Sequence, residues 1–402
     1  MSITSKNILT NPELKKLIRD AKKIFNAKFQ AKGNSCISAF PASLILLGDH
    51  THYNDGIMLL TTANAFSVAV CSATEDGQIN IAVESPDFSV SENSNNPAES
   101  SIKCGNLYLG NLISVLKNKG ILKKGFNLLL YSNIPQSIGM GFVAANQLSF
   151  VDALSQLFEF KLTSDEILQL CLEAEKLYLG KMSNPSHYYA ILNSEPSSII
   201  KVDLRFKTFK LYRDILKDYK LLLFDNSNEI PNPRKICNER IEECTIGVQA
   251  LRLYIWGIKN LRDVSLEFLA RHTHVIPNLI YKRILYTVKE KIRVETATEY
   301  IENTYFNGFG KLLFESHEGL RNDYDIGNER LDMIVNTLAK ETGVIGAKII
   351  SCSNIESVIC IARKKDASKI IASISEKYSD KYSFKLNYHI FTSFGGSTNL
   401  KI

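Results

Sequence analysis

The segment GDHTHYNDG, residues 48–56, gathers many side chains that can bind or react. It holds two histidines, two aspartates, a tyrosine and an asparagine, and it directly follows the apolar run 44–47. Imidazole exchanges protons near neutral pH and carboxylates accept hydrogen bonds, so this composition suits acid–base chemistry or the binding of a polar ligand. Polar groups at the end of a buried strand therefore predict a functional site here.

A second candidate is SIGMGFVAAN, residues 137–146, which lies between the apolar segment FNLLLYS and a stretch with helical periodicity. Gly139 and Gly141 permit close approach of the backbone, and N–H groups at a helix N-terminus can hold an anion. Loops of this kind are also frequent as plain turns. The strand, glycine loop and helix thus leave a phosphate site and a simple connection both open.

The bulk composition excludes several classes of protein. The chain has 402 residues, with 45% hydrophobic and 22% charged residues, which predicts two packed lobes. The net charge of +6 is spread along the chain apart from a modest basic cluster, KNKGILKK, so we expect no nucleic-acid partner. The eight cysteines include no CxxC pair, which favours reduced thiols. Without a signal core or a run of 18 apolar residues, we expect a cytoplasmic protein and no membrane partner.

Local patterns predict the elements around the first candidate. Asn11 and Pro12 form the start of an amphipathic helix, as N-cap and first-turn residue. FSVAVCSA and INIAVES flank the turn TEDGQ, and its Asp76-Gly77 pair predicts a β-hairpin between these two strands. The polar segment SVSENSNNPAESS, residues 89–101, predicts a surface loop.

Further elements follow the glycine loop. Thr163 and Glu166 form a capping box at the start of a helix, and the short strands SSIIKVDL and TFKLYRD come next. A second unit begins near residue 216, is mainly helical to about 345, and closes with strands around one helix. We therefore predict an α+β fold with mixed sheets and helices in two lobes, residues 1–215 and 216–402.

In their order, these segments resemble the galactokinase branch of the GHMP small-molecule kinases over nearly the whole chain. FPASLILLGDHTHYNDGIMLL corresponds to the sugar-binding signature of that family, and NIPQSIGMGFVAA to its phosphate loop. CNERIEEC and FGKLLFESHEGLRNDYDIGNERLD match second-lobe segments, while GVIGAKIISCSNIESVICIA falls on the third motif. The resemblance implies a two-lobed GHMP-kinase-like fold. The family transfers the ATP γ-phosphoryl group to the anomeric hydroxyl of a sugar.

The two catalytic positions of the family are substituted in this chain. Ser43 stands where the family has an arginine, and His187 stands where it has an aspartate. Phosphoryl transfer requires positive charge on the transferring group and a base or orienting group for the hydroxyl. The resemblance therefore predicts that a fixed cation is missing.

The sugar side keeps its shape and changes its chemistry. His52 replaces an aspartate of the family, Cys237 replaces a tyrosine, and Asp49 stands where the family has the longer glutamate. His50 and Tyr53 match the family. The resemblance assigns substrate binding to Asp49, His50, His52, Tyr53, Asn184 and Cys237.

The nucleotide side is also altered. The resemblance assigns cofactor binding to Gly139, Gly141, Phe142, Val143 and Glu175. Phe142 brings an apolar ring to where a phosphate is expected, while Glu175 keeps the metal-binding carboxylate. In the third motif, glycines are replaced by Ser351, Ser353, Glu356 and Ser357, which disfavours phosphate binding.

We therefore predict a galactokinase-like pseudokinase that binds a small polar ligand, such as a sugar, and acts as a binding or regulatory protein. The alternative is an active kinase that uses ATP and Mg²⁺ with His187 as general base. A hydrolase or isomerase built on the histidines is a third reading.

Two smaller questions concern the histidines. His52, His187, Cys237 and Asp49 are ligand types for zinc or iron, so a metal site is a further hypothesis if they face one cavity. We interpret His317 as a structural residue and assign no role to His272, His274 or His389.

Overall fold

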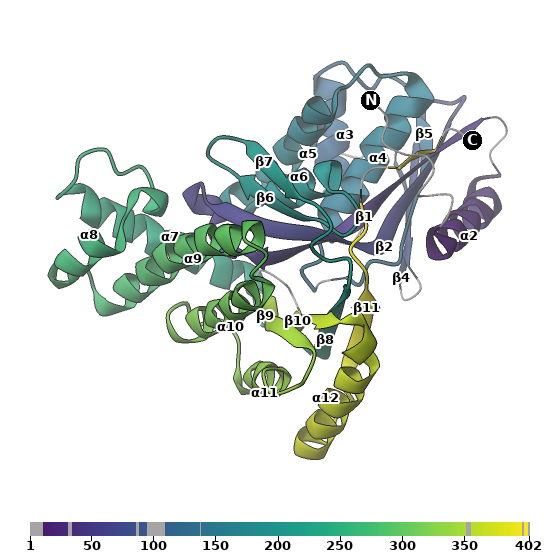
Figure 1. Cartoon of the computed structure of the whole chain (residues 1–402). Helices are drawn as coiled ribbons and strands as arrows, with labels where there is room; N and C mark the ends of the chain where they lie inside the picture. The colour runs from purple at the N-terminus through teal and green to yellow at the C-terminus, as the bar shows by residue number, and fades with distance from the viewer. Residues whose placement is uncertain are drawn as a thin grey trace.

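A computed structural model of the chain describes residues 11–30, 34–85, 88–94, 109–136, 138–350, 355–395 and 398–400. Two β-sheets and their flanking helices form the molecule, as Figure 1 shows, so the predicted α+β fold is confirmed. None of the described helices is both long enough and apolar enough to span a membrane.

The first half of the chain builds the larger sheet. Its elements are α2 (Pro12–Phe29), β1 (Ser35–Leu47), a 3₁₀ turn (His52–Asn54), β2 (Ile57–Ala73), β3 (Ile79–Ser85), β4 (Phe88–Ser94), α3 (Leu109–Asn118), β5 (Phe126–Ser132), α4 (Phe142–Phe158), α5 (Ser164–Leu179), a 3₁₀ turn (Gly180–Met182), α6 (Ser186–Asn193), β6 (Ile199–Asp203) and β7 (Thr208–Tyr212).

The second half builds the smaller sheet and most of the long helices. Its elements are β8 (Tyr219–Glu229), α7 (Pro233–Arg252), a 3₁₀ turn (Leu261–Asp263), α8 (Leu266–Arg271), a 3₁₀ turn (Thr273–Val275), α9 (Asn278–Glu302), α10 (Phe306–Asn322), α11 (Glu329–Leu338), β9 (Val344–Ile350), β10 (Ile355–Arg363), a 3₁₀ turn (Lys364–Asp366), α12 (Ala367–Tyr382), β11 (Asn387–Phe391) and β12 (Thr398–Leu400).

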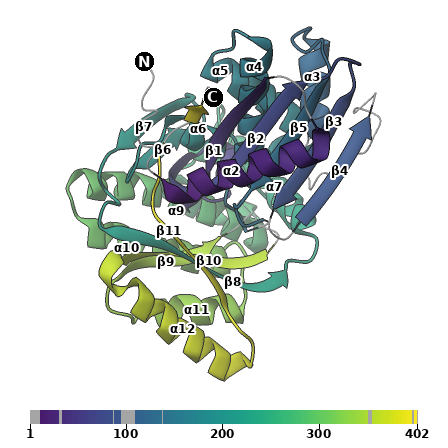
Figure 2. The ribbon, with the colours of Figure 1, turned by 90° about the vertical axis from the view of Figure 1, so that its right-hand side faces the viewer.

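A long antiparallel hairpin of β1 and β2 forms the spine of the larger sheet. Its strand order is β12-β1-β2-β5-β3-β4, with β6 paired to the early part of β2 and β7 paired to β6. The helix α2 crosses one face of this sheet, as Figure 2 shows, and α4 and α6 contact the strands from the other side. The turn of the hairpin carries residues 48–56, so the sheet presents that segment at one end.

Two local predictions for this sheet were wrong. β2 and β3 are not paired as a hairpin, because β5 lies between them and pairs with both strands. Gly77 does adopt the predicted positive φ, but the chain leaves that turn to cross over β5. Residues 89–94 of the predicted surface loop belong to strand β4, which pairs with β3 in an antiparallel ladder because pairing uses backbone groups. The remainder, 95–101, lies outside the described residues.

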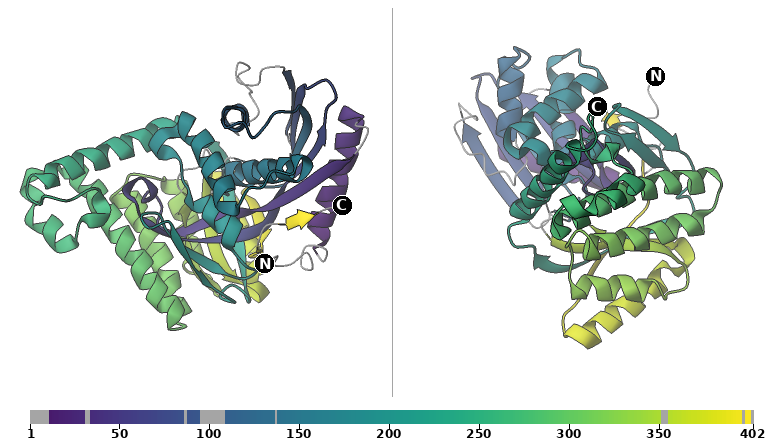
Figure 3. Two further views of the ribbon diagram at one scale, coloured as in Figure 1. Left: turned by 90° about the horizontal axis from the view of Figure 1, so that it is seen from above. Right: turned by 90° about the vertical axis from the view of Figure 1, so that its left-hand side faces the viewer.

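The smaller sheet has the order β11-β8-β10-β9, and its strands β8, β9 and β10 share one hydrophobic core with α7, α9, α10, α11 and α12. Figure 3 shows α8 at the outer end of this helical layer, away from both sheets. The last strand, β12, pairs with β1 in the larger sheet. The chain therefore crosses back after residue 391, and a boundary at 215/216 stays a prediction.

Local capping follows the sequence. The side chain of Asn11 accepts a hydrogen bond from Leu14 N at 3.0 Å, and Thr163 and Glu166 form the predicted capping box. The largest apolar core combines the larger sheet with Leu221, Leu223 and Ile359 of the smaller one. This shared core holds the two sheets together at the place where the candidate site lies.

Candidate active site

The predicted catalytic positions meet at the glycine loop. Ser43 Oγ lies 2.7 Å from His187 Nδ1, and Ser43 N donates to Met140 O at 3.1 Å. A register shift between Pro41 and Ala42 marks a bulge just before Ser43, and such bulges re-aim the side chains that follow. Strand β1, the glycine loop and helix α6 thus converge on one point.

Gly141 is required by this arrangement. Its φ is +64°, a left-handed conformation that residues with a side chain rarely adopt. A Cβ added there would lie 2.3 Å from Ser43 Oγ and 2.9 Å from His187 Nδ1. The Ser43–His187 pair therefore occupies the space directly against the loop backbone, at the N-terminus of α4.

The segment 48–56 is anchored to the second half of the chain by buried charges. Gly48 N donates to Glu290 Oε1 at 2.9 Å, and Ser316 Oγ donates to the same oxygen at 2.8 Å. Asp49 forms an ion pair with Lys348, and both side chains are almost fully buried, at 1% and 0% exposure. These contacts join the turn between β1 and β2 to α9, α10 and β9.

The histidines of this segment are neutral at pH 7. Burial is the main cause that lowers the pKa of His50 and of His52 to about 3, and of His187 to about 4. The charges of His50, Asp49 and His187 each act on the pKa of His52. Asp49, His52 and His187 therefore lie close to one another.

The remaining predicted substrate-binding residues lie on different elements and have different partners. Tyr53 Oη lies 3.1 Å from His50 Nδ1 and is also hydrogen-bonded to Tyr324 Oη. Tyr324 belongs to the hydrophobic core of the smaller sheet and its helices. Asn184 Oδ1 accepts hydrogen bonds from N and Oγ of Ser186, so its carbonyl end is engaged at the start of α6. Cys237 lies half-buried in α7.

Among the predicted substrate-binding residues, two buried polar atoms have no hydrogen-bond partner in the described part of the chain. They are Asp49 Oδ1 and His52 Nδ1. An unsatisfied buried polar atom costs about 1–3 kcal/mol, so native structures rarely retain one without a reason. Both atoms lie where the sequence predicted ligand contacts, and a polar ligand would satisfy them.

On the nucleotide side, Phe142 and Val143 are half-buried and pack against the largest core. Glu175 is buried and accepts a hydrogen bond from Ser183 Oγ at 3.1 Å. Burial raises the pKa of the Glu175 carboxyl to about 7. At neutral pH this group is therefore only partly ionised.

The third motif is only partly described. Ser351 and Ser353 lie outside the described residues, and Ser357 is buried in β10. The carboxylate of Glu356 accepts hydrogen bonds from the side-chain amides of Asn226, at 2.7 Å, and Asn328. Glu356 therefore connects β8, β10 and the N-cap of α11.

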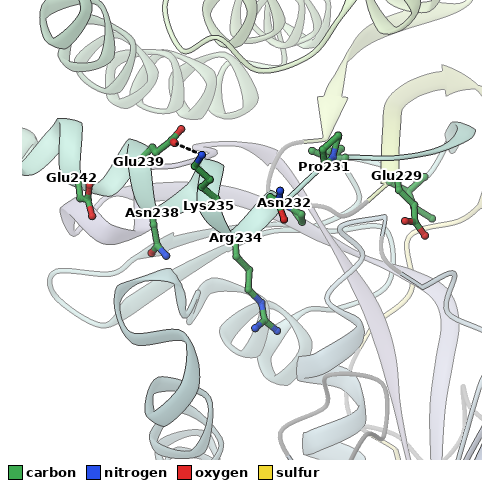
Figure 4. Close-up of a pocket in the computed structure, with 11 residues that line it drawn as sticks. Glu229, Pro231, Asn232, Arg234, Lys235, Asn238, Glu239 and Glu242 are labelled. Carbon is green, nitrogen blue, oxygen red and sulfur yellow. Dashed lines mark ion pairs between the residues drawn. The ribbon is translucent and has the colours of Figure 1, made fainter.

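An open pocket of about 1220 Å³ lies beside the start of α7, as Figure 4 shows. Arg234, Asn238, Glu239 and Ile355 are among the residues that line it. The Arg234 guanidinium stacks over the ring of Tyr178 in α5, 4.4 Å from its centre. The lining of this pocket contains both acidic and basic side chains.

The metal hypothesis was wrong for the described part of the chain. No group of three or more His, Cys, Asp or Glu side chains there is arranged to hold a metal ion. Asp49 is already paired with Lys348, and Nδ1 of His187 is engaged by Ser43. These partners engage one oxygen of Asp49 and one ring nitrogen of His187.

The sequence did not single out the groups that anchor the site. Lys348 is a lone charge inside the apolar segment VIGAKII, and that isolation was the available signal for a buried ion pair. Glu290, which is fully buried in α9, carries no comparable signal because α9 is rich in charged residues. His317 lies buried next to Asp332, at 3.3 Å.

Comparisons with known proteins give a domain match and full-length relatives. Residues 106–194 match the family model for the GHMP kinases N terminal domain. Galactokinases from Thermotoga neapolitana and Lactococcus lactis subsp. cremoris are each 25% identical to the chain, covering 89% and 90% of it and 97% and 92% of their own lengths.

Solved structures share the fold. Lactococcus lactis galactokinase complexed with galactose superimposes with a TM-score of 0.87 at 22% identity, over 95% of this chain and all of that one. A mevalonate kinase superimposes with a TM-score of 0.64 at 18% identity, over 89% of this chain and 99% of that one. The matched domain, the full-length relatives and the shared fold together support a galactokinase-like member of the GHMP kinase superfamily.

Proposed function

We propose that this protein binds a small, polar, sugar-like ligand and does not transfer a phosphoryl group. The observation that carries the proposal is the Ser43–His187 hydrogen bond of 2.7 Å against the glycine loop. By resemblance, these two positions hold an arginine and an aspartate in active galactokinases. Here they hold a hydroxyl and an imidazole, and burial keeps that imidazole neutral at pH 7.

A neutral pair cannot provide what phosphoryl transfer needs at this place. Negative charge spreads over the transferring group in the transition state, and a fixed cation stabilises it. The nearby Lys348 does not replace that cation, because its ammonium is paired with Asp49. The site therefore lacks an uncommitted positive charge among these three residues.

The nucleotide positions support the same conclusion. Mg²⁺ prefers ionised carboxylates and retained waters. Glu175 is buried with a pKa raised to about 7, so ionising it there is costly at neutral pH. Phe142 and Val143 present apolar surface at the head of α4, where phosphate oxygens would need donors. These residues fit Mg²⁺–ATP poorly.

The ligand side supports binding. Asp49 Oδ1 can accept a hydrogen bond, and His52 Nδ1 can accept or donate one depending on its tautomer. Sugar hydroxyls both donate and accept, so they match this pair. Because one solved relative is a complex with galactose, galactose is the first ligand to test.

The test measures ligand-dependent thermal stability and turnover on one preparation. Galactose alone should raise Tm in a concentration-dependent way, and ATP with MgCl₂ alone should not. Asp49→Asn should reduce the galactose shift, whereas the exposed Asp380→Asn should keep it. ADP formation with galactose should stay at background. ADP release that depends on the sugar would refute the loss of catalysis, and no shift with a panel of sugars would refute the ligand class.

An active kinase is the second candidate, and the neutral state of His187 favours it. A neutral imidazole can accept a proton from a sugar hydroxyl. If Ser43 accepts the hydrogen bond at Nδ1, then Nε2 of His187 is the basic nitrogen; if Ser43 donates, Nε2 carries the proton and cannot act. Sugar-dependent ADP release that is abolished in His187→Ala would establish this alternative.

A further inference from the structure

Two cysteines face each other across the spine of the larger sheet. Cys36 of β1 pairs directly with Cys71 of β2 in the antiparallel register. Directly opposite residues in such a pair have Cα atoms about 4.5–5.5 Å apart. Disulfides join residues whose Cα atoms are about 4.4–6.8 Å apart, so the backbone spacing already fits a bond.

Both side chains also point to the same face of the sheet. The adjacent pair, Ile37 and Val70, belongs to the core beneath α2. Because side chains alternate along a strand, Cys36 and Cys71 point to the opposite face. Cys71 accordingly belongs to the largest core, on the side covered by α4. The thiol of Cys36 also contributes to raising the pKa of Cys71, after the larger effect of burial.

The two thiols differ in access to an oxidant. Cys36 is half-buried near the start of β1, whereas Cys71 is fully buried near the end of β2, between β1 and β5. A thiolate is the species that attacks an oxidant, and burial keeps Cys71 protonated. Oxidation therefore begins at Cys36, and Cys71 is placed to react second.

We propose that Cys36 and Cys71 form a reversible intrachain disulfide with hydrogen peroxide as oxidant. Cys36 attacks one peroxide oxygen, becomes a sulfenic acid and releases water. The Cys71 sulfur then displaces the hydroxyl of that sulfenic acid, the S–S bond forms and a second water leaves. In total, two thiols and one peroxide give one disulfide and two waters, and a dithiol reductant reverses the change.

The disulfide would constrain the β1–β2 hairpin that carries the site. It would join the start of β1 to the end of β2, and the turn between these strands carries Asp49 and His52. Linking the open end of the hairpin restricts the unfolded chain, so the oxidised protein should have a higher Tm than the reduced protein. This inference does not depend on the proposed ligand.

The experiment treats the whole protein with a small excess of hydrogen peroxide and maps its thiols. The expected result is a mass loss of about 2 Da, a Cys36–Cys71 peptide that dithiothreitol removes, and a reversible rise in Tm. Cys36→Ser should abolish all three effects. Cys237→Ser, which removes another half-buried thiol, should leave them unchanged. Cys36→Ala provides a second variant if the serine disturbs folding.

Three outcomes would overturn the proposal. They are a peptide linking Cys36 to a cysteine other than Cys71, stepwise oxygen addition at Cys36 without a bond, and an unchanged thiol count under conditions that oxidise free glutathione. A Tm rise that persists in Cys36→Ala would show that the stabilisation has another source.

Discussion

The buried ion pair between Asp49 and Lys348 gives the sharpest stability prediction. Lys348 is 0% exposed and Asp49 is 1% exposed, so Lys348→Met leaves a carboxylate in the interior without its counter-ion. Removing one partner of a buried pair costs about 3–5 kcal/mol. For a protein whose total stability is on the order of 5–15 kcal/mol, that loss should be large.

The double variant Asp49→Asn/Lys348→Met separates the ion pair from simple packing. It removes both charges and keeps similar volumes, so it should lose much less than the sum of the two single variants. Lys377→Met is the matched control, because Lys377 is half exposed and its pair with Glu341 should contribute less than about 1 kcal/mol.

Equilibrium urea unfolding followed by far-UV circular dichroism measures these effects. Trp256, the single tryptophan, is 99% exposed, so its fluorescence would report folding poorly. The reasoning fails if Lys348→Met unfolds at the same urea concentration as Lys377→Met. It also fails if the double variant is as unstable as the two single changes added together.

Two further predictions concern the same site. Gly141→Ala should lower stability by more than about 1 kcal/mol in urea unfolding, because its φ of +64° and the nearby Ser43 hydroxyl both oppose a Cβ; an unchanged midpoint would contradict this. Acid should destabilise the protein below about pH 6.5, since the unfolded chain protonates histidines that the folded chain keeps neutral. The four with lowered pKa values are His50, His52, His187 and His317. Glu175, whose folded pKa is about 7, has the opposite effect, because the folded chain binds one proton there that the unfolded chain releases. The unfolded chain therefore binds roughly three more protons than the folded chain. The free energy of unfolding should then fall by about 4 kcal/mol for each pH unit lost between pH 6 and 4.5. A flat stability profile over that range would refute the burial of these groups.

Sequence patterns predicted the elements that local chemistry controls. The helix cap at Asn11, the capping box at Thr163 and the strand, glycine loop and helix around Gly141 were all correct. They depend on backbone groups within a few residues, and the side chains involved are themselves the signal. The wrong hairpin between β2 and β3 shows the limit: Gly77 set the turn, but pairing with β5 decided which strands met.

The sequence by itself determined which residue types stand at the site, and resemblance placed Ser43, Asp49, His52 and His187 in it. Only the tertiary structure decided what each of these groups can do. Lys348 is 299 positions from Asp49 in the chain, and Ser43 is 144 from His187, yet each pair is in contact. Charge state and hydrogen bonding depend on burial and on such distant partners, because a pKa is set by the surroundings of a group and not by its neighbours in sequence.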